Sequence, residues 1–410
     1  MAASRIVSES RSTGLAPTLA LTLAMAAAGC SAPEAPPTVS VVDSAGVRVV
    51  TNLTLDVPTW SLGPEPVLAL GTVDEEGPEQ FYAVSAARRL AGGRLVIANG
   101  GTRELRYFSL DGKHLASVGG EGQGPGEFGF PGPLWTLAGD SLAVWDGRLR
   151  RLSVFSPEGT FSRTASLGDA VANPDILAVV PDGRILVAAE VFDFSQGESF
   201  RVMPMHFLLF GPDGALLDSR PSQRLAEYGA LGESGMIGTP LFAPRTEAAA
   251  DTGGYWVGTQ ESEEVLRYTV TGDLAMKVRW PGEDRRTSAA DADVLLQEDL
   301  ARSEEARHPR IRQLHAARPR KDVFPSHGRL RTTTHGWLWM EAYRRPGQQG
   351  PDTWRIFDGD GVLRGRIHLP ERTRILEIGA DYLVGVWRDE FDVEHVRYYE
   401  VTRTEPLEEG

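Results

Sequence analysis

The sequence predicts an all-β protein, a six-bladed β-propeller with a short helical insertion between blades 4 and 5. Three observations carry this prediction: a strand motif that recurs along the chain, a regular spacing between its copies, and turn residues at the strand ends. The 45 Gly and 27 Pro of the 410 residues lie in short, scattered clusters. Such clusters indicate many turns rather than one disordered tract.

The recurring motif is a short apolar strand that follows a turn, and its copies begin at residues 93, 140, 183, 253, 336 and 381. Three of the intervals between copies are 47, 43 and 45 residues, and two are longer, at 70 and 83 residues. A second strand that ends in Asp-Gly or Glu-Gly follows most copies, as in 105–112 and 152–159. Alternating apolar positions predict antiparallel meanders. A repeat of this length with about four short strands is typical of propeller blades.

The last copy of the motif ends near Thr402 without a fourth strand, whereas the N-terminal part of the chain offers a spare one at 66–70. The stretch after it, 71–81, parallels 119–128, which follows the fourth strand of the first full blade. We therefore expect 66–70 to pair with the strand near 396–401. This pairing would close the ring and cover the edge strands that an open sheet exposes.

Residues 1–29 have the composition of an export signal. Arg5 and Arg11 form a basic start, and the following apolar run is shorter than the roughly 20 residues of a membrane-spanning helix. Small residues then lead to Cys30, the single cysteine. This junction resembles a bacterial lipobox, although Ala27 stands where Leu is usual. The resemblance implies cleavage before Cys30 and lipid attachment to it; the alternative is ordinary signal cleavage, which leaves a soluble protein.

Residues 30–44 form a Pro-rich, polar stretch, which predicts a semi-rigid spacer between a membrane and a propeller at 45–403. Ser31 stands where many lipoproteins of the inner membrane have Asp. The resemblance therefore implies the outer membrane, with the protein facing the periplasm or the outside. A short acidic tail, 404–410, ends the chain.

Residues 287–321 are the one stretch with a helical pattern. Ser288 followed by Asp291 is typical of a capping box, and Leu296 with Leu300 gives an apolar face. A basic run follows in an otherwise acidic protein. Its candidate ligand-binding side chains are Arg310, Arg312, Arg318 and Arg320. Two interpretations stay open: an anion-binding patch, and a solvated face whose arginines pair with nearby carboxylates.

Charge and motif content argue against several function classes. The net charge of −14 is unlike that of a nucleic-acid binder, which needs a basic footprint. A single cysteine and the absence of CxxC, HExxH and GxSxG leave no metal, cofactor or catalytic constellation in the sequence. His308 and His315 are close in sequence, but Pro309 is expected to break the helix between them. The glycine-rich segment 119–126 lacks a Gly-Lys-Ser/Thr ending and is expected to connect two blades.

The repeat pattern over residues 45–403 resembles the six-bladed, NHL-like or TolB-like β-propellers of bacterial lipoproteins and periplasmic proteins. The best-matching pieces are 124–128, between two blades, and 387–397, near the C-terminus. The resemblance implies the fold and not an activity. Lactonase and amidating-lyase relatives hold a metal at the ring axis with acidic, Asn or His residues. The inner strands here are predicted to begin near Gln80, Leu134, Asp175, Glu247, Arg329 and Arg372, a set that gives no matching ligands.

Loop length indicates which face of the ring binds. The first-to-second and third-to-fourth turns of the blades are short, and both kinds lie on one side. The long segments belong to the other side and comprise 190–204, 221–246, 281–322 and 343–352. Because loops on a rigid scaffold commonly carry binding residues, that face is the predicted binding surface. Our main hypothesis is a non-catalytic, envelope-anchored binding or scaffolding propeller for a protein or anionic envelope ligand. The alternative is a propeller hydrolase or lyase with an active site in the central funnel.

Overall fold

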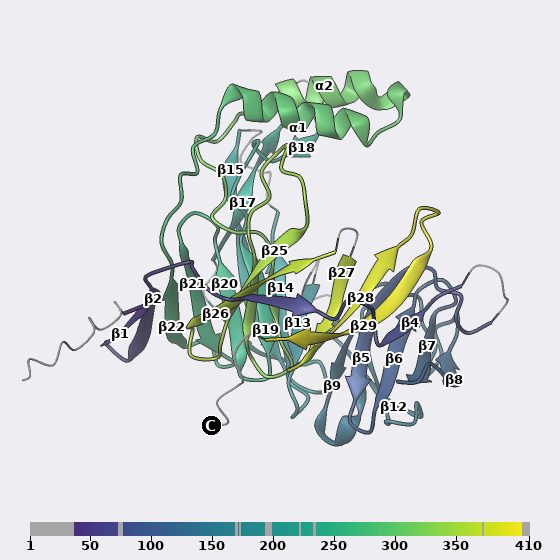
Figure 1. Ribbon diagram of the computed structural model, residues 1–410. Helices are drawn as coiled ribbons and strands as arrows, with labels where there is room; N and C mark the ends of the chain where they lie inside the picture. The colour runs from purple at the N-terminus through teal and green to yellow at the C-terminus, as the bar shows by residue number, and fades with distance from the viewer. Residues whose placement is uncertain are drawn as a thin grey trace, which may run out of the picture. The chain divides into compact units, whose positions relative to one another are not determined.

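Antiparallel meanders dominate the structure, a computed structural model shown in Figure 1. It describes residues 37–72, 77–168, 171, 174–192, 199–220, 223–232, 235–370 and 373–403. Within these residues, strand pairing forms six four-stranded meanders, numbered here as blades 1 to 6 in chain order. The all-β propeller predicted from the repeat is the fold observed.

The first three blades follow one another along the chain. Blade 1 comprises β5 (Val84–Leu90), β6 (Arg94–Asn99), β7 (Glu104–Ser109) and β8 (His114–Gly119). Blade 2 comprises β9 (Pro131–Thr136), β10 (Leu142–Asp146), β11 (Arg151–Phe155) and β12 (Phe161–Ser166), with the 3-10 turn η1 (Ala138–Asp140). Blade 3 comprises β13 (Pro174–Val179), β14 (Ile185–Glu190), β15 (Arg201–Phe210) and β16 (Leu216–Ser219), and β17 (Gln223–Ala230) and β18 (Ile237–Gly238) extend it.

Blades 4 and 5 also follow one another along the chain, whereas blade 6 takes its fourth strand from the N-terminal part of the described residues. Blade 4 comprises β19 (Glu247–Asp251), β20 (Gly254–Gly258), β21 (Glu264–Thr269) and β22 (Leu274–Arg279). Blade 5 comprises β23 (Leu330–Thr332), β24 (Leu338–Glu341), β25 (Asp352–Phe357) and β26 (Leu363–Leu369). Blade 6 comprises β27 (Thr373–Ile378), β28 (Tyr382–Arg388), β29 (Glu394–Thr402) and β4 (Leu68–Leu70).

Six apolar clusters hold the blades together, and each is shared by two neighbouring blades. The second strand of a blade contributes to both of its clusters. In β6, for example, Leu95 and Ile97 pack toward blade 6, whereas Val96 and Ala98 pack toward blade 2. Because both faces of these strands are buried, their sequences are continuous apolar runs rather than alternating ones. This is the physical origin of the recurring motif.

The expected ring closure is confirmed. In the ladder of β4 and β29, Leu70 lies opposite Val396 and Leu68 lies opposite Tyr398. Leu68 and Leu70 are buried in the cluster between blades 6 and 1. One blade is therefore built from both ends of the chain, and its edge is covered by a paired strand.

The residues before β4 wrap around the outside of blades 4 to 6. A hairpin of β1 (Val39–Ser44) and β2 (Val47–Asn52) extends the sheet of blade 4, because β2 pairs with β22 in the parallel direction. Strand β3 (Thr59–Leu62) runs parallel to β26 and also pairs with the end of β29. Residues 39–44 thus form a strand of the fold, which corrects the prediction that the spacer extends to residue 44.

The predicted helical insertion lies between β22 and β23. It comprises α1 (Ala289–Ala301), the 3-10 turn η3 (Glu305–Arg307) and α2 (His308–Ala316). The capping box of Ser288 and Asp291 is present, as expected. Pro309 does not break a helix but lies in the first turn of α2, where its missing N–H is not needed. None of the described helices is long and apolar enough to cross a membrane.

The insertion lies above the ring on the same side as the upper ends of β15 and β17 (Figure 1). We call this side the long-loop face. Two of the segments expected as loops, 190–204 and 221–246, partly form strands there. The first half of β15 pairs with β17, which in turn pairs with β18, so this blade extends further than the others. A small core of Leu241, Phe242 and Phe324, with Leu295 of α1 against it, fixes the insertion to this extension.

Candidate functional site

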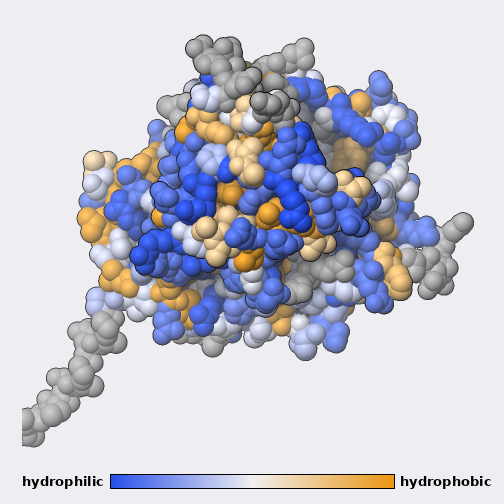
Figure 2. All heavy atoms as spheres, turned by 90° about the horizontal axis from the view of Figure 1, so that it is seen from above, coloured by the Kyte–Doolittle hydropathy of each residue, from blue (hydrophilic) through white to orange (hydrophobic). Residues whose placement is uncertain are grey.

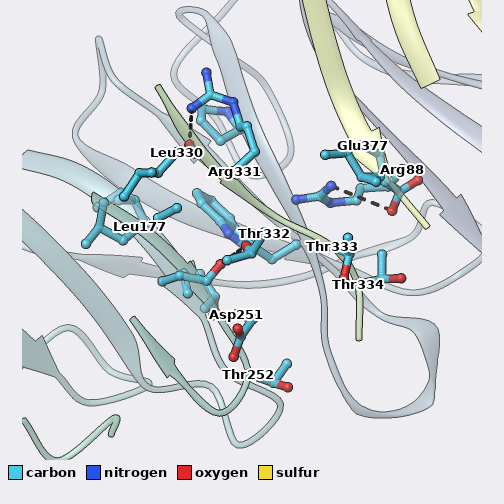
Figure 3. A pocket seen from close by; sticks show the side chains of 18 of the residues that line it. Arg88, Leu177, Asp251, Thr252, Leu330, Arg331, Thr332, Thr333, Thr334 and Glu377 are labelled. Atoms are coloured by element: carbon cyan, nitrogen blue, oxygen red, sulfur yellow. Dashed lines mark hydrogen bonds and ion pairs between the residues drawn. The ribbon is translucent and has the colours of Figure 1, made fainter. Parts of the chain in front are cut away.

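A funnel runs along the centre of the ring, and Figure 3 shows it from close by. Its cavity volume is about 420 Å³, and each of β5, β9, β13, β19, β23 and β27 contributes lining residues. These are the inner strands of the six blades. Strand β5 begins at Val84, four residues after the predicted Gln80, and the other inner strands begin within three residues of their predicted starts.

The deeper part of the funnel holds an ion pair that the fold itself satisfies. Arg88 on β5 and Glu377 on β27 are 3.6 Å apart, and they join blades 1 and 6. Glu377 also accepts the backbone N–H of Arg89 at 2.7 Å, and Arg88 donates to the carbonyl of Leu134 at 2.7 Å. Burial raises the pKa of Glu377, and the charge of Arg88 opposes that rise. These contacts indicate a structural pair.

A second group of charges lies near the start of the inner strands. Asp175, Glu247, Arg331 and Arg374 are each the first or second residue of β13, β19, β23 and β27. The Asp175 carboxylate is open to the water of the funnel, yet the surrounding strands enclose it. That enclosure raises the pKa of Asp175 and of Glu247, and the positive charges of Arg331 and Arg245 oppose the rise.

The Arg331 guanidinium is enclosed in the same way, and desolvation lowers its pKa. Its one hydrogen bond among the described residues runs to the carbonyl of Leu330, at 2.9 Å (Figure 3). Perturbed pKa values of neighbouring acidic and basic groups are common at functional sites. Among the described residues, no three His, Cys, Asp or Glu side chains gather as a metal site would require.

The long-loop face carries two of the four predicted arginines as open groups. Arg310 and Arg312 are exposed on α2. Arg310 contacts the side chains of Gln313 and Met236, whereas Arg312 makes no hydrogen bond or ion pair within the described part of the chain. Arg320 is exposed as well, and its guanidinium donates to Thr287.

Arg318, the fourth candidate, turns toward the protein. It donates to the carbonyl of Thr239 at 2.7 Å and to that of Pro240 at 3.4 Å, and burial lowers its pKa. Lys321 at the end of the basic run pairs with Glu227 on β17. These two cations therefore fasten the insertion to blade 3, and the open basic surface is centred on α2.

A second cavity, of about 460 Å³, lies beside α1 and is lined by four arginines among other residues. Each of these arginines already has a partner in the fold: Arg302 pairs with Glu298, Arg318 bonds to Thr239, Arg344 pairs with Asp352, and Arg345 donates to the carbonyl of Asp284. The cavity is thus bordered by structural contacts rather than by open charges.

The surface of the long-loop face mixes charge with small apolar patches. Figure 2 looks onto this face and shows mainly hydrophilic surface, interrupted by scattered hydrophobic areas. Among the exposed apolar side chains are Met236 and Ile237, around β18, and Val294 on α1. Met236 contacts the guanidinium of Arg310, so at least this apolar side chain borders the exposed arginines of α2.

Cys30 lies outside the described residues, so its predicted lipid attachment is a matter of sequence alone. Sequence reasoning placed Asp175, Glu247 and the strand of Arg331 on the inner wall but did not recognise their charges as a group. Consecutive members of the group are 43 residues or more apart, and no local pattern connects them. An alignment of the blades on their first strands would have shown that these charged residues occupy equivalent positions, and therefore the same end of the funnel.

Comparison with known proteins supports the fold. No family model matches the chain, and no curated protein matches it. A solved structure from Bacteroides fragilis, whose description names it as exported, superposes with a TM-score of 0.50 at 14% identity, over 87% of this chain and 99% of that one. A member of the DUF4221 family from Bacteroides vulgatus gives a TM-score of 0.47 at 9% identity, over 85% of this chain and 100% of that one. At these identities the similarity concerns the fold alone.

Proposed function

We propose that this protein is a binding or scaffolding propeller of the bacterial envelope that engages a protein or anionic ligand through its long-loop face. The observation that carries the proposal is the asymmetry of the ring. The helical insertion and the extension of blade 3 both rise on one face (Figure 1). Elaborations on one side of a rigid scaffold are typical of binding surfaces.

The chemistry of this face favours an anionic partner. Arg310 and Arg312 are exposed on α2, whereas the nearby Arg302 and Arg307 pair with Glu298 and Glu304. A cluster of positive charge in a chain of net charge −14 creates a local field of opposite sign. Guanidinium groups bind carboxylates and phosphates bidentately, and nearby Met236 supplies apolar contact area.

Capture of a partner by the full chain from envelope extracts tests this proposal. We expect the variant Arg310→Gln/Arg312→Gln to retain less of the partner than the wild type. The matched control is Lys113→Gln/Arg366→Gln, which removes the same charge from exposed residues of blades 1 and 5. Retention by the control should equal that of the wild type. Equal losses in both variants would mean that net charge, and not this face, governs binding.

The envelope location is part of the proposal. The basic start, short apolar run and Cys30 together support a lipoprotein similar to NHL-like or TolB-like propellers, held at the outer membrane. The Bacteroides fragilis structure, which is described as an exported protein, has a similar fold, and this is compatible with the proposed location. We expect Cys30→Ser to abolish incorporation of labelled lipid and to move the protein from the membrane fraction to the soluble fraction. Lipid labelling that persists in the variant would contradict the anchor.

A further inference from the structure

The mouth of the funnel holds charges that form no ion pair within the described residues. Nearby pairs are complete: Arg245 with Glu190, Arg329 with Glu341, and Arg388 with Glu394. Four further charges take part in none of the ion pairs of the described residues, and these are Asp175, Glu247, Arg331 and Arg374. We call them the mouth charges. They comprise two negative and two positive groups, so their net charge is zero although they form no ion pairs with one another.

The mouth charges are separated by sign around the ring. Asp175 and Glu247 come from β13 and β19, in blades 3 and 4, and Arg331 and Arg374 come from β23 and β27, in blades 5 and 6. Because these blades follow one another around the ring, one arc of the mouth is acidic and the next is basic. Arg331 is close enough to influence the pKa of Asp175, Glu247 and Arg374.

The hydrogen-bonding capacity of these groups is largely unused. A guanidinium has five N–H donors, and toward the described residues Arg331 uses one of its nitrogens, which donates to the carbonyl of Leu330. Arg374 donates to the carbonyl of Val84. Neither carboxylate of the group accepts a hydrogen bond from the described residues. Enclosed charges without partners cost free energy, so a pair of opposite charges supplied by a ligand would stabilise this arrangement.

We propose that the funnel binds a small zwitterion that carries a carboxylate and a primary ammonium, as an amino acid or a short peptide with free termini does. Arg331, which lines the cavity, receives the carboxylate, for which its planar guanidinium offers two parallel donors, and Arg374 adds positive charge from the same ends of the inner strands. Asp175, which also lines the cavity, receives the ammonium, and Glu247 at the start of β19 adds negative charge nearby. The cavity of about 420 Å³ is within the usual range for small-molecule sites. The site lies below the long-loop face and does not depend on the arginines of α2.

Calorimetric titration of the full chain tests the ligand chemistry. The probes are alanine, alanyl-alanine, N-acetyl-alanyl-alanine and alanyl-alanine amide. We expect saturable binding of alanine or of the free dipeptide, and a loss of about tenfold or more in affinity when either terminus is blocked. A preference for alanine or for the dipeptide tells which of the two the site accommodates. Absence of binding by both free probes, or equal affinity for free and blocked dipeptides, would overturn the proposal.

Variants assign the two ends of the ligand. Arg331→Gln should lower the affinity for the free zwitterion about tenfold or more. The affinity for alanyl-alanine amide, which is already weaker, should stay nearly unchanged because this probe lacks the carboxylate. Asp175→Asn should instead reduce the difference in affinity between alanyl-alanine, which has a free ammonium, and N-acetyl-alanyl-alanine, which does not. Its side chain is open to funnel water, so this variant is informative even if Arg331→Gln lowers stability. Lys113→Gln, at an exposed position between β7 and β8 and outside the funnel, is the control and should bind as the wild type does. Unchanged affinities in both funnel variants would contradict the assignment.

Discussion

Replacing Leu68 and Leu70 together with Ala should lower the free energy of unfolding by about 4 kcal/mol or more, because each buried Leu→Ala change typically costs about 2–5 kcal/mol. Leu70 is 2% exposed and Leu68 is 7% exposed. Both belong to the cluster that joins the last blade to the first, so their loss weakens the closure of the whole ring. Denaturant unfolding followed by tryptophan fluorescence measures the change.

Val67 provides a matched control for the closure. It is 57% exposed and immediately precedes β4, so Val67→Ala should change the free energy of unfolding by less than about 0.5 kcal/mol. The double variant should also aggregate more readily, because it loosens the strand that covers the edge of blade 6. If the double variant were as stable as Val67→Ala, the pairing of β4 with β29 would not hold the ring together.

Acid should destabilise the protein through His327. This side chain is fully buried, and burial lowers its pKa from 6.5 to about 4. Its Nδ1 lies 2.7 Å from the carbonyl of Gly328, and its Nε2 has no hydrogen-bond partner within the described residues. The unfolded chain binds a proton below pH 6.5, whereas the folded protein resists it until about pH 4. Stability should therefore fall as pH decreases through this window, by roughly 3 kcal/mol from this group.

The variant His327→Gln separates this effect from other titrations. It removes the proton-binding group, so its unfolding free energy should decline less steeply between pH 6.5 and 4 than that of the wild type. His368→Gln, at an exposed position of β26, is the comparison for the loss of a histidine outside the core. Identical slopes for wild type and His327→Gln would show that His327 is not the group that senses acid.

The repeat made the propeller predictable, because the second strand of each blade is buried on both faces and leaves a continuous apolar run in the sequence. Closure by 66–70 was predictable for a related reason, since the last blade lacked a strand and the N-terminus had a spare one. The capping box at Ser288 was readable because its two side chains are three residues apart. In each case the decisive signal is local in sequence.

The features that sequence missed depend on contacts between distant segments. Strands β1 to β3 lie outside the repeat. Two of them pair in parallel with outer strands of blades 4 and 5, and a pattern of antiparallel meanders does not predict parallel pairs. Arg318 resembles its neighbours in the basic run, yet the fold brings Thr239 beside it and turns it inward. The mouth charges of the funnel come from four blades, and only the closed ring brings them together.

The central claim is that the long-loop face, through the exposed arginines of α2, binds the partner. The most direct measurement is the salt dependence of the affinity between the full chain and its captured partner. Exposed ionic contacts are screened within a Debye length of about 8 Å at physiological ionic strength. We predict that affinity for the wild type and for Lys113→Gln/Arg366→Gln falls steeply as salt rises, and that Arg310→Gln/Arg312→Gln shows a weaker dependence. Equal affinities and equal salt slopes for all three proteins would contradict the claim.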